Sequence, residues 1–504
     1  MAVAYSADRV YKDVGDTRQL FIDDDVIAVV KNVTRRQHTP QKHAGGPLIR
    51  RDKPWEGNTY FRNSCFNVIW DDKADLYKCW YEDFYDYFGG SRGTFQRSRI
   101  HYAESEDGID WVKPALGKHV VDGHEGTNTV IDLSPDEAVS CTTVLLDPLE
   151  TDPSRRFKAL YAHRPEKGLC MMFSADGIDW TPYERNPIFE RWDDDVEILT
   201  YDRIDNKYVL WGRYGGHPGR SQHPGFDAWF APVWPGRPEG IWGTRRRIYR
   251  LESEDCFNWS DAKLMFDPGD EDNLDDGLYG FVPWRVGENH LGIMTVLHQV
   301  DNTVDMYLYQ SRDGLDWNRM LMHRPLIPRG GPGSFDEFGI ETPNQPLEVG
   351  DEVRIYYGGM NVHHDWWLGM ANDGIDVPEA RDRSLSQNGH HLGLATLRLD
   401  GYVSLDATVR EGWVETKPLF STGRRLYING RCRPDGYIKV EMMDSWNNVW
   451  DGYSGENCRA FTGDSVHHQI AWSERDTVTE IPGSVKLRFY LRNAELYGFQ
   501  FAES

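Results

Sequence analysis

The chain has 504 residues, of which 39% are hydrophobic and 13% aromatic, so it is too apolar for a disordered chain and too long for one ordinary core. Its 80 acidic and 56 basic residues give a formal net charge of −24, which opposes binding to nucleic acids and to anionic membranes. We therefore expect two packed units and neither kind of partner; the charge says nothing about the oligomeric state.

The sequence shows no signal for a membrane span or for export. No apolar run approaches the roughly 18 residues that a span requires, and the start, Met1 to Ser6, lacks a basic region followed by an apolar one. We expect a cytoplasmic protein, or a secreted one if a signal segment was removed. The seven cysteines show no Cys-x-x-Cys spacing, and we expect them to be buried thiols.

One short phrase, Ser-x-Asp-Gly-x-Asp-Trp, recurs along the chain. Complete copies occupy 105–111, 174–180 and 311–317, and degenerate copies occupy 253–259 and 371–377. Asp-Gly between two alternating apolar runs is a strong hairpin signal, because glycine adopts a positive φ without steric cost. Each copy therefore predicts a tight turn between two strands, followed by an aromatic residue that packs between neighbouring sheets.

A strand of aromatic and aliphatic residues precedes each turn. These strands are 76–81, 157–161, 208–211, 290–294 and 353–357. Five paired elements predict five four-stranded blades, at about 55–115, 136–190, 191–274, 275–334 and 335–407. Helical periodicity is close to absent between residues 50 and 400, which argues against an α/β barrel.

The two ends of the chain lie outside this repeat. The first 54 residues, which include Gln19–Asp23, either supply a closing strand or dock on the C-terminal unit. After about Gly412, alternating segments such as Tyr437–Glu441 and Val485–Leu491 predict half-buried antiparallel strands. The predicted fold is all-β: an N-terminal segment (1–54), a five-bladed β-propeller (55–407) and a C-terminal β-sandwich (408–504).

Each predicted blade places carboxylates near the start of its innermost strand, where the blades of a propeller face one channel. Acidic turns also cap strands, so acids at matching repeat positions are interpreted as structural anchors: Glu56, Asp193, Asp275 and Asp336. Acids that break the repeat are the catalytic candidates: first Glu341 and Glu197, then Asp194 and Glu337. Two carboxylates with separated pKa values are what glycoside hydrolysis requires.

Polar and aromatic residues near the same strand starts are candidates for binding a sugar. We predict this role for Tyr60, Arg62, Asn63, Asp195, Asp276, Tyr279, Trp284, Arg285 and Trp366. The histidines of His363-His364-Asp365 and those at His217 and His223 show no recognised metal-ligand spacing. We expect no cofactor and no catalytic metal, although oxygen ligands in an acidic channel would suit a structural calcium ion.

Three features resemble the five-bladed propeller glycosidases of glycoside hydrolase families 32 and 43. They are the Ser-x-Asp-Gly-x-x-Trp hairpins, the phrase Gly333–Asp336 followed by Ile340–Pro343, and the trailing sandwich. The resemblance implies an acidic triad with a first-blade nucleophile or base, a second Asp and a Glu acid. Glu341-Thr342-Pro343 is similar to the acid motif but falls one blade late, and Arg62-Asn63-Ser64 stands where the first-blade Asp-Pro belongs.

These observations predict a glycosidase that acts on a carbohydrate, with fructosides and arabinofuranosides as the substrates that the resemblance implies. Two alternatives stay open. One is a propeller that binds carbohydrate without cleaving it. The other is a glycoside phosphorylase or transglycosylase; a phosphorylase would need a basic phosphate pocket, for which Arg62, Arg285 and Arg329 are the evident residues.

Overall fold

The computed structural model describes residues 12–88, 95–133, 138–164, 168–189, 197–203, 205–213, 246–270, 272–273, 275–299, 301–320, 324–364, 389–473, 475–478 and 484–503. Over these ranges the chain is built from β-strands and two short 3-10 turns, η1 (Asn63–Cys65) and η2 (Pro153–Arg155). The predicted all-β class is confirmed. No helix in the described ranges is both long and apolar enough to cross a membrane.

Three antiparallel sheets follow one another along the first half of the chain. The first has the order β10-β9-β8-β6, with β7 also paired to β8; its strands are β6 (Asn58–Tyr60), β7 (Phe66–Asp71), β8 (Leu76–Phe88), β9 (Phe95–Ser105) and β10 (Thr129–Ile131). The second contains β11 (Ala138–Leu146), β12 (Phe157–Arg164), β13 (Gly168–Ser174) and β14 (Trp180–Pro182). The third contains β15 (Glu197–Asp202), β16 (Lys207–Gly212), β17 (Ile248–Ser253) and β18 (Lys263–Phe266).

A nine-stranded sheet comes next. Its first part contains β19 (Asp276–Val286), β20 (Asn289–His298), β21 (Thr303–Ser311) and β22 (Trp317–Arg319). Its second part contains β23 (Gly339–Glu341), β24 (Leu347–Val349), β25 (Glu352–Met360), β26 (His390–Arg398) and β5 (Gln41–Lys42). One parallel pair, Val304 with Gly339, joins the two parts. The five strands predicted before the turns therefore lie in β8, β12, β16, β20 and β25.

The repeated phrase forms the same turn at each copy that is described. In the copy at 174–180, the Ser174 hydroxyl accepts the N–H of Gly177, and the Asp176 carboxylate accepts the N–H groups of Ile178 and Asp179 at 2.8 and 2.9 Å. The copies at 105–111, 253–259 and 311–317 repeat these bonds. The hairpins predicted there are confirmed, whereas 371–377 lies outside the described residues.

Three of the turns also connect neighbouring sheets. In each of them the glycine carbonyl accepts a hydrogen bond from a side chain of another sheet. Trp80 on β8 donates to Gly177 at 2.6 Å, and Arg250 on β17 donates to Gly314 at 3.1 Å. Tyr356 on β25 donates to the Gly108 carbonyl at 3.0 Å. This last bond joins the end of the repeat to its beginning.

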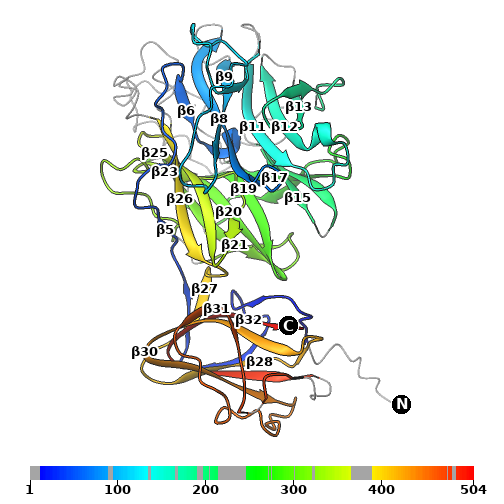
Figure 1. Ribbon diagram of the computed structural model, residues 1–504, viewed down its shortest axis with the longest axis vertical. Helices are drawn as coiled ribbons and strands as arrows, with labels where there is room; N and C mark the ends of the chain where they lie inside the picture. Colours follow the sequence, from blue (N-terminus) through cyan, green and yellow to red (C-terminus); the bar gives the residue numbers. More distant parts are fainter. Residues whose placement is uncertain are drawn as a thin grey trace.

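The C-terminal part of the chain forms an eight-stranded sheet, which occupies the lower lobe in Figure 1. Its strands are β2 (Gln19–Leu20), β3 (Ile27–Lys31), β4 (Thr34–Gln37), β27 (Val403–Ala407), β28 (Gly412–Thr416), β30 (Arg425–Met443), β31 (Asp464–Gln469) and β32 (Lys486–Ala502). A separate parallel pair joins β1 (Lys12–Asp13) to β29 (Leu419–Phe420). This lobe has its own apolar core, which includes Phe21, Val440, Trp472 and Phe489.

The N-terminal segment pairs with two different sheets. Its strands β2, β3 and β4 pair with β32, β28 and β27, so Gln19–Asp23 docks on the C-terminal sheet. Further along, β5 pairs with β26, the strand that ends the repeat. Figure 1 shows this segment running from the lower lobe to the side of β26.

Candidate functional site

The candidate site begins with Arg62, which precedes the η1 turn and is buried. Its guanidinium donates hydrogen bonds to the hydroxyls of Tyr60 and Tyr279, and it also bonds Nε2 of His364. Its Nε lies 3.6 Å from Oε1 of Glu341. The segments before η1, at the start of β19, at the end of β23 and after β25 therefore converge on this one guanidinium.

Glu341, the last residue of β23, is completely buried. Burial raises the pKa of its carboxyl group to about 7, while Arg62, the backbone N–H of Asn63 and the charge of Arg213 oppose that shift. A carboxylic acid with a pKa near 7 can hold a proton at neutral pH and release it during a reaction. Glu341 therefore has the electrostatic environment of a general acid.

Glu197, the first residue of β15, is also completely buried. Its backbone N–H donates to the hydroxyl of Ser64 at 3.3 Å. Because Ser64 and Asn63 belong to the same 3-10 turn, Glu197 and Glu341 flank that turn. The two acids that break the sequence repeat are thus brought to one region of the fold.

Asn63 has a left-handed backbone, with φ of 33°. Its side chain is 2% exposed, and neither Oδ1 nor Nδ2 has a hydrogen-bond partner within the described part of the chain. A non-glycine residue in this conformation is strained, and buried polar atoms without partners cost free energy. Both observations indicate that Asn63 is a candidate for binding a ligand rather than a residue that only fills the core.

Tyr279 lies at a β-bulge in β19, where the extra residue re-aims a side chain. Three guanidinium groups surround its ring: the Cζ atoms of Arg213, Arg246 and Arg62 lie 4.6, 4.9 and 5.1 Å from the ring centroid. The sequence reasoning missed Arg213 and Arg246. They follow β16 and precede β17, so no signal at the strand starts pointed to them.

His390, at the start of β26, was also missed. Its ring stacks on Tyr60 with 4.8 Å between centroids and 17° between planes. Burial, followed by the charge of Arg62, lowers the pKa of His390 well below its usual value, so the imidazole is neutral at pH 7. His364 packs edge-on against Tyr279, with 5.0 Å between ring centroids. The sequence analysis considered His364 only as a possible metal ligand, not as part of a sugar site.

Glu56 is held as the anchor interpretation requires. Its Oε2 accepts the N–H groups of Asp52 and Lys53 at 2.9 and 3.0 Å. Its Oε1 accepts the Tyr81 hydroxyl at 2.7 Å and pairs with Lys113 at 2.6 Å. Both of its carboxylate oxygens are therefore engaged by neighbouring backbone and side-chain donors.

Asp336, a second predicted anchor, is also buried and bound to two neighbouring side chains. Its Oδ2 accepts a hydrogen bond from Tyr357 at 3.0 Å and pairs with Lys42 of β5 at 2.5 Å. Glu337, a second-choice catalytic candidate, is half-buried and accepts the N–H of Gly333 at 2.7 Å. Its carboxylate therefore closes the turn that precedes β23.

Asp276, a predicted sugar-binding residue, belongs to a buried charged network. His298 lies between Asp276 and Asp305, with ring nitrogens 2.7 and 3.2 Å from their carboxylates. Arg329, one of the residues considered for phosphate binding, pairs with Asp305 at 3.1 Å. Desolvation favours the neutral acid, but the hydrogen bonds and charge of His298 and the hydrogen bonds of Asn273 together lower the pKa of Asp276.

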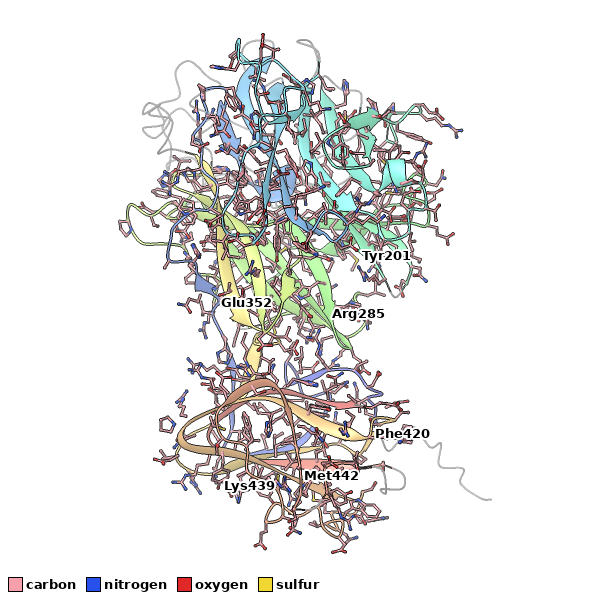
Figure 2. The ribbon with its side chains drawn as sticks, in the orientation of Figure 1. Tyr201, Arg285, Glu352, Phe420, Lys439 and Met442 are labelled. Carbon is pink, nitrogen blue, oxygen red and sulfur yellow. The ribbon has the colours of Figure 1, made fainter. Side chains whose placement is uncertain are left out.

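Trp284 and Arg285 do not join the residues around Arg62. They stand five and six positions beyond Tyr279 on β19, which corresponds to roughly 20 Å along a strand for Arg285. Both line a different cavity. Figure 2 shows Arg285 at the end of the upper lobe that is nearer the eight-stranded sheet.

Four predicted residues cannot be assigned a place. Asp193, Asp194, Asp195 and Trp366 lie outside the described residues. In the part of the chain that is described, no group of three or more His, Cys, Asp or Glu side chains could hold a metal ion. The structural calcium ion stays a prediction.

No protein-family model and no curated protein matches this chain. Three solved structures illustrate what it is similar to. The glycoside hydrolase family 32 β-fructofuranosidase of Bombyx mori is 12% identical, with a TM-score of 0.42, and the match covers 91% of this chain and 94% of that one. The β-1,2-mannobiose phosphorylase of Listeria innocua is 12% identical (TM-score 0.46; 72% and 97%). The catalytic domain of the Coprinopsis cinerea family 62 α-L-arabinofuranosidase is 12% identical (TM-score 0.41; 71% and 97%). A family 32 enzyme is thus among the solved structures that this chain is similar to.

Proposed function

We propose that this chain is a glycoside hydrolase in which Glu341 is the general acid and Glu197 is the second carboxylate. The observation that carries the proposal is the environment of Glu341: a completely buried acid, with a pKa raised to about 7, held 3.6 Å from a buried arginine. Such an acid donates its proton to the oxygen of a leaving sugar. The unpartnered side chain of Asn63 would bind a sugar hydroxyl nearby.

Glu197 completes the pair because it flanks the same turn as Glu341. In a retaining enzyme the second carboxylate attacks the sugar, and in an inverting enzyme it activates water. The anomer that forms first, read by proton NMR during turnover, distinguishes the two. Fructosides and arabinofuranosides are the first substrates to try, since they are those of the families that the sequence resembles.

We also infer the architecture that holds this site. The sheets formed by β6 to β26, with β5, would be the five blades of a propeller, and the eight-stranded sheet would be the sandwich. The bonds from Trp80 to Gly177 and from Arg250 to Gly314, and the bond from Tyr356 back to Gly108, support a closed ring. The pairing of β27 with β4 and β32 would start the sandwich at Val403 rather than at residue 408.

The test is product release from a panel of fructosides, arabinosides and plant and microbial glycans. Glu341→Gln and Glu197→Gln should each lose more than roughly a thousandfold in kcat while remaining folded. Glu352→Gln is the matched control, because that acid lies on β25 and, among the described residues, forms its one ion pair with Arg354 of its own strand. Saturable sugar binding without turnover, unchanged in both variants, would instead indicate a carbohydrate-binding propeller.

A second candidate is phosphorolysis, in which phosphate replaces water as the acceptor. The observation in its favour is the group formed by Arg62, Arg213 and Arg246 around Tyr279, since guanidinium groups are suited to phosphate. A phosphorylase would require phosphate for turnover and release a sugar phosphate, detected by ³¹P NMR. A hydrolase would turn over at the same rate without phosphate.

A further inference from the structure

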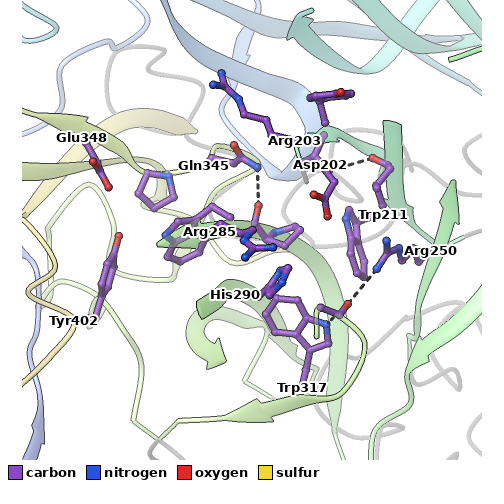
Figure 3. Close-up of a pocket in the computed structure, with 17 residues that line it drawn as sticks. Asp202, Arg203, Trp211, Arg250, Arg285, His290, Trp317, Gln345, Glu348 and Tyr402 are labelled. Carbon is purple, nitrogen blue, oxygen red and sulfur yellow. Dashed lines mark hydrogen bonds between the residues drawn. The ribbon is translucent and has the colours of Figure 1, made fainter. Parts of the chain in front are cut away.

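A cavity lies at the opposite ends of β15 and β19 from Glu197 and Tyr279. It has a volume of about 640 Å³, and the ends of β15 and β19 contribute to its wall, together with the turn before β22, residues 345–348 and Tyr402. Figure 3 shows its lining residues. Cavities of roughly 300 to 1,000 Å³ with aromatic walls and a few polar groups are typical of small-ligand sites.

Indole side chains form much of this wall. Trp211, Trp284 and Trp317 all line the cavity. Trp211 is 2% exposed, and its Nε1 has no hydrogen-bond partner within the described part of the chain. A buried N–H without an acceptor costs free energy that an oxygen of a bound molecule would recover. The flat indole faces suit the C–H face of a sugar ring.

Positive charge is concentrated in the same cavity. Arg285 forms no ion pair among the described residues, and its buried Nε has no acceptor there. Arg203 also lines the cavity and is exposed. Arg250 is already paired with Glu252 at 3.0 Å.

The wall contains two acids beside its three arginines, so its formal charge stays positive. Glu348 pairs with Arg18 at 2.7 Å, and Asp202 accepts the N–H of Asp205 at 3.3 Å. His290 packs edge-on against Trp317, and burial followed by the charge of Arg285 lowers its pKa. At pH 7 the imidazole is therefore neutral and suited to hydroxyl groups, while Arg285 provides the charge.

We propose that this cavity is a second carbohydrate site, separate from the Glu341 site, and that it binds a sugar unit carrying an anionic substituent. The sugar ring packs against the indoles, and Arg285 binds the carboxylate of a uronic acid or a sulfate ester. A guanidinium group binds either anion through two parallel hydrogen bonds. In a chain with a net charge of −24, the local positive charge of this cavity favours acidic sugar units over neutral ones.

The test is titration of the protein with trigalacturonate, neutral galactotriose and galactose 6-sulfate, followed by calorimetry and tryptophan fluorescence. At least one anionic probe should bind, and galactotriose should bind at least tenfold more weakly. Arg285→Gln should lower the affinity for the anionic probe at least tenfold. Glu341→Gln should bind the probe with the affinity of the wild type. The probe that binds distinguishes carboxylate from sulfate recognition.

If Arg285→Gln fails to fold, Arg203→Gln replaces it in the test, because Arg203 is exposed. Arg203→Gln should lower the affinity for the anionic probe by a few-fold. Three results would overturn the proposal: no binding of either anion, equal binding of galactotriose, or binding lost in Glu341→Gln and kept in Arg285→Gln. The last result would place the ligand beside Glu341. Hydrolysis of a neutral substrate by Arg285→Gln is unaffected in every case, so the two proposals fail separately.

Discussion

Arg62 and Glu341 form a buried ion pair, with 3.6 Å between Nε and Oε1 and with side chains that are 5% and 0% exposed. Burial and charge act on Glu341 in opposite directions: desolvation raises its pKa, and the neighbouring guanidinium lowers it. The resulting value of about 7 makes proton donation near neutral pH depend on both residues.

Arg62→Met should therefore move the pH dependence of activity. In the wild type, kcat/KM falls as the pH rises through about 7, because the acid loses its proton. Without the guanidinium the pKa of Glu341 rises further, so this fall moves to higher pH by at least about one unit. The measurement is kcat/KM from pH 5 to 9, and Arg285→Met, in the other cavity, should leave the profile in place. A move to lower pH would contradict the assigned role of Arg62.

Glu56→Gln should lower stability without removing catalysis. The carboxylate accepts four hydrogen bonds, from Asp52, Lys53, Tyr81 and Lys113, and an amide cannot accept them all. The expected loss in the free energy of unfolding is about 2 to 4 kcal/mol. Urea unfolding measures it, with the half-exposed Glu352→Gln as a control expected within about 0.5 kcal/mol. A stable variant that has lost activity would show that Glu56 acts in the reaction.

Gly177→Ala should be strongly destabilising for two reasons. Gly177 has φ of +79°, and an added Cβ would lie 2.3 Å from the ring of Trp80. Gly123 has φ of +83° with no atom within 4 Å of the position of its Cβ, so Gly123→Ala carries the backbone cost alone, about 1 to 2 kcal/mol. The clash with Trp80 should add about 1 to 3 kcal/mol. Thermal unfolding of both variants measures the two losses of stability. Equal losses would mean that the contact between the turn and Trp80 does not hold the two sheets together.

His298→Gln should change how stability depends on pH. Desolvation lowers the pKa of His298, but the hydrogen bonds and the negative charges of Asp276 and Asp305 together raise it to about 9. A raised pKa means that this stabilisation is complete below the unfolded value of about 6.5 and is lost as the pH rises through about 9. The free energy of unfolding should be higher in the wild type than in the variant at pH 6. This difference should be smaller at pH 10, by up to about 3 kcal/mol. Urea unfolding at both pH values measures this, and Glu341 contributes equally to both proteins. A constant difference would contradict the charged state of His298.

The repeated turns could be read from the sequence because their bonds are local. Ser174, Asp176 and Gly177 bond within the same short phrase, so residue type and spacing contain the information. The strands before the turns were predictable for a similar reason, since apolar residues are dense along each of them. The short strand β5 had no such signal: two residues pair with β26, more than 350 positions away.

The candidate site shows the same division. The acids Glu341 and Glu197 stood out because they break the repeat, and the η1 turn brings them to one region. Arg213, Arg246 and His390 reach that region from other strand ends, where nothing in the sequence distinguishes them. Trp284 and Arg285 were grouped with Tyr279 because they share β19, but a strand advances about 3.3 Å per residue, and six residues carry a side chain to the opposite end.

The sequence by itself determined the turns, the strands and the acids that break the pattern. Tertiary structure alone decided which side chains meet, because that depends on how far each strand extends and which strand becomes its neighbour.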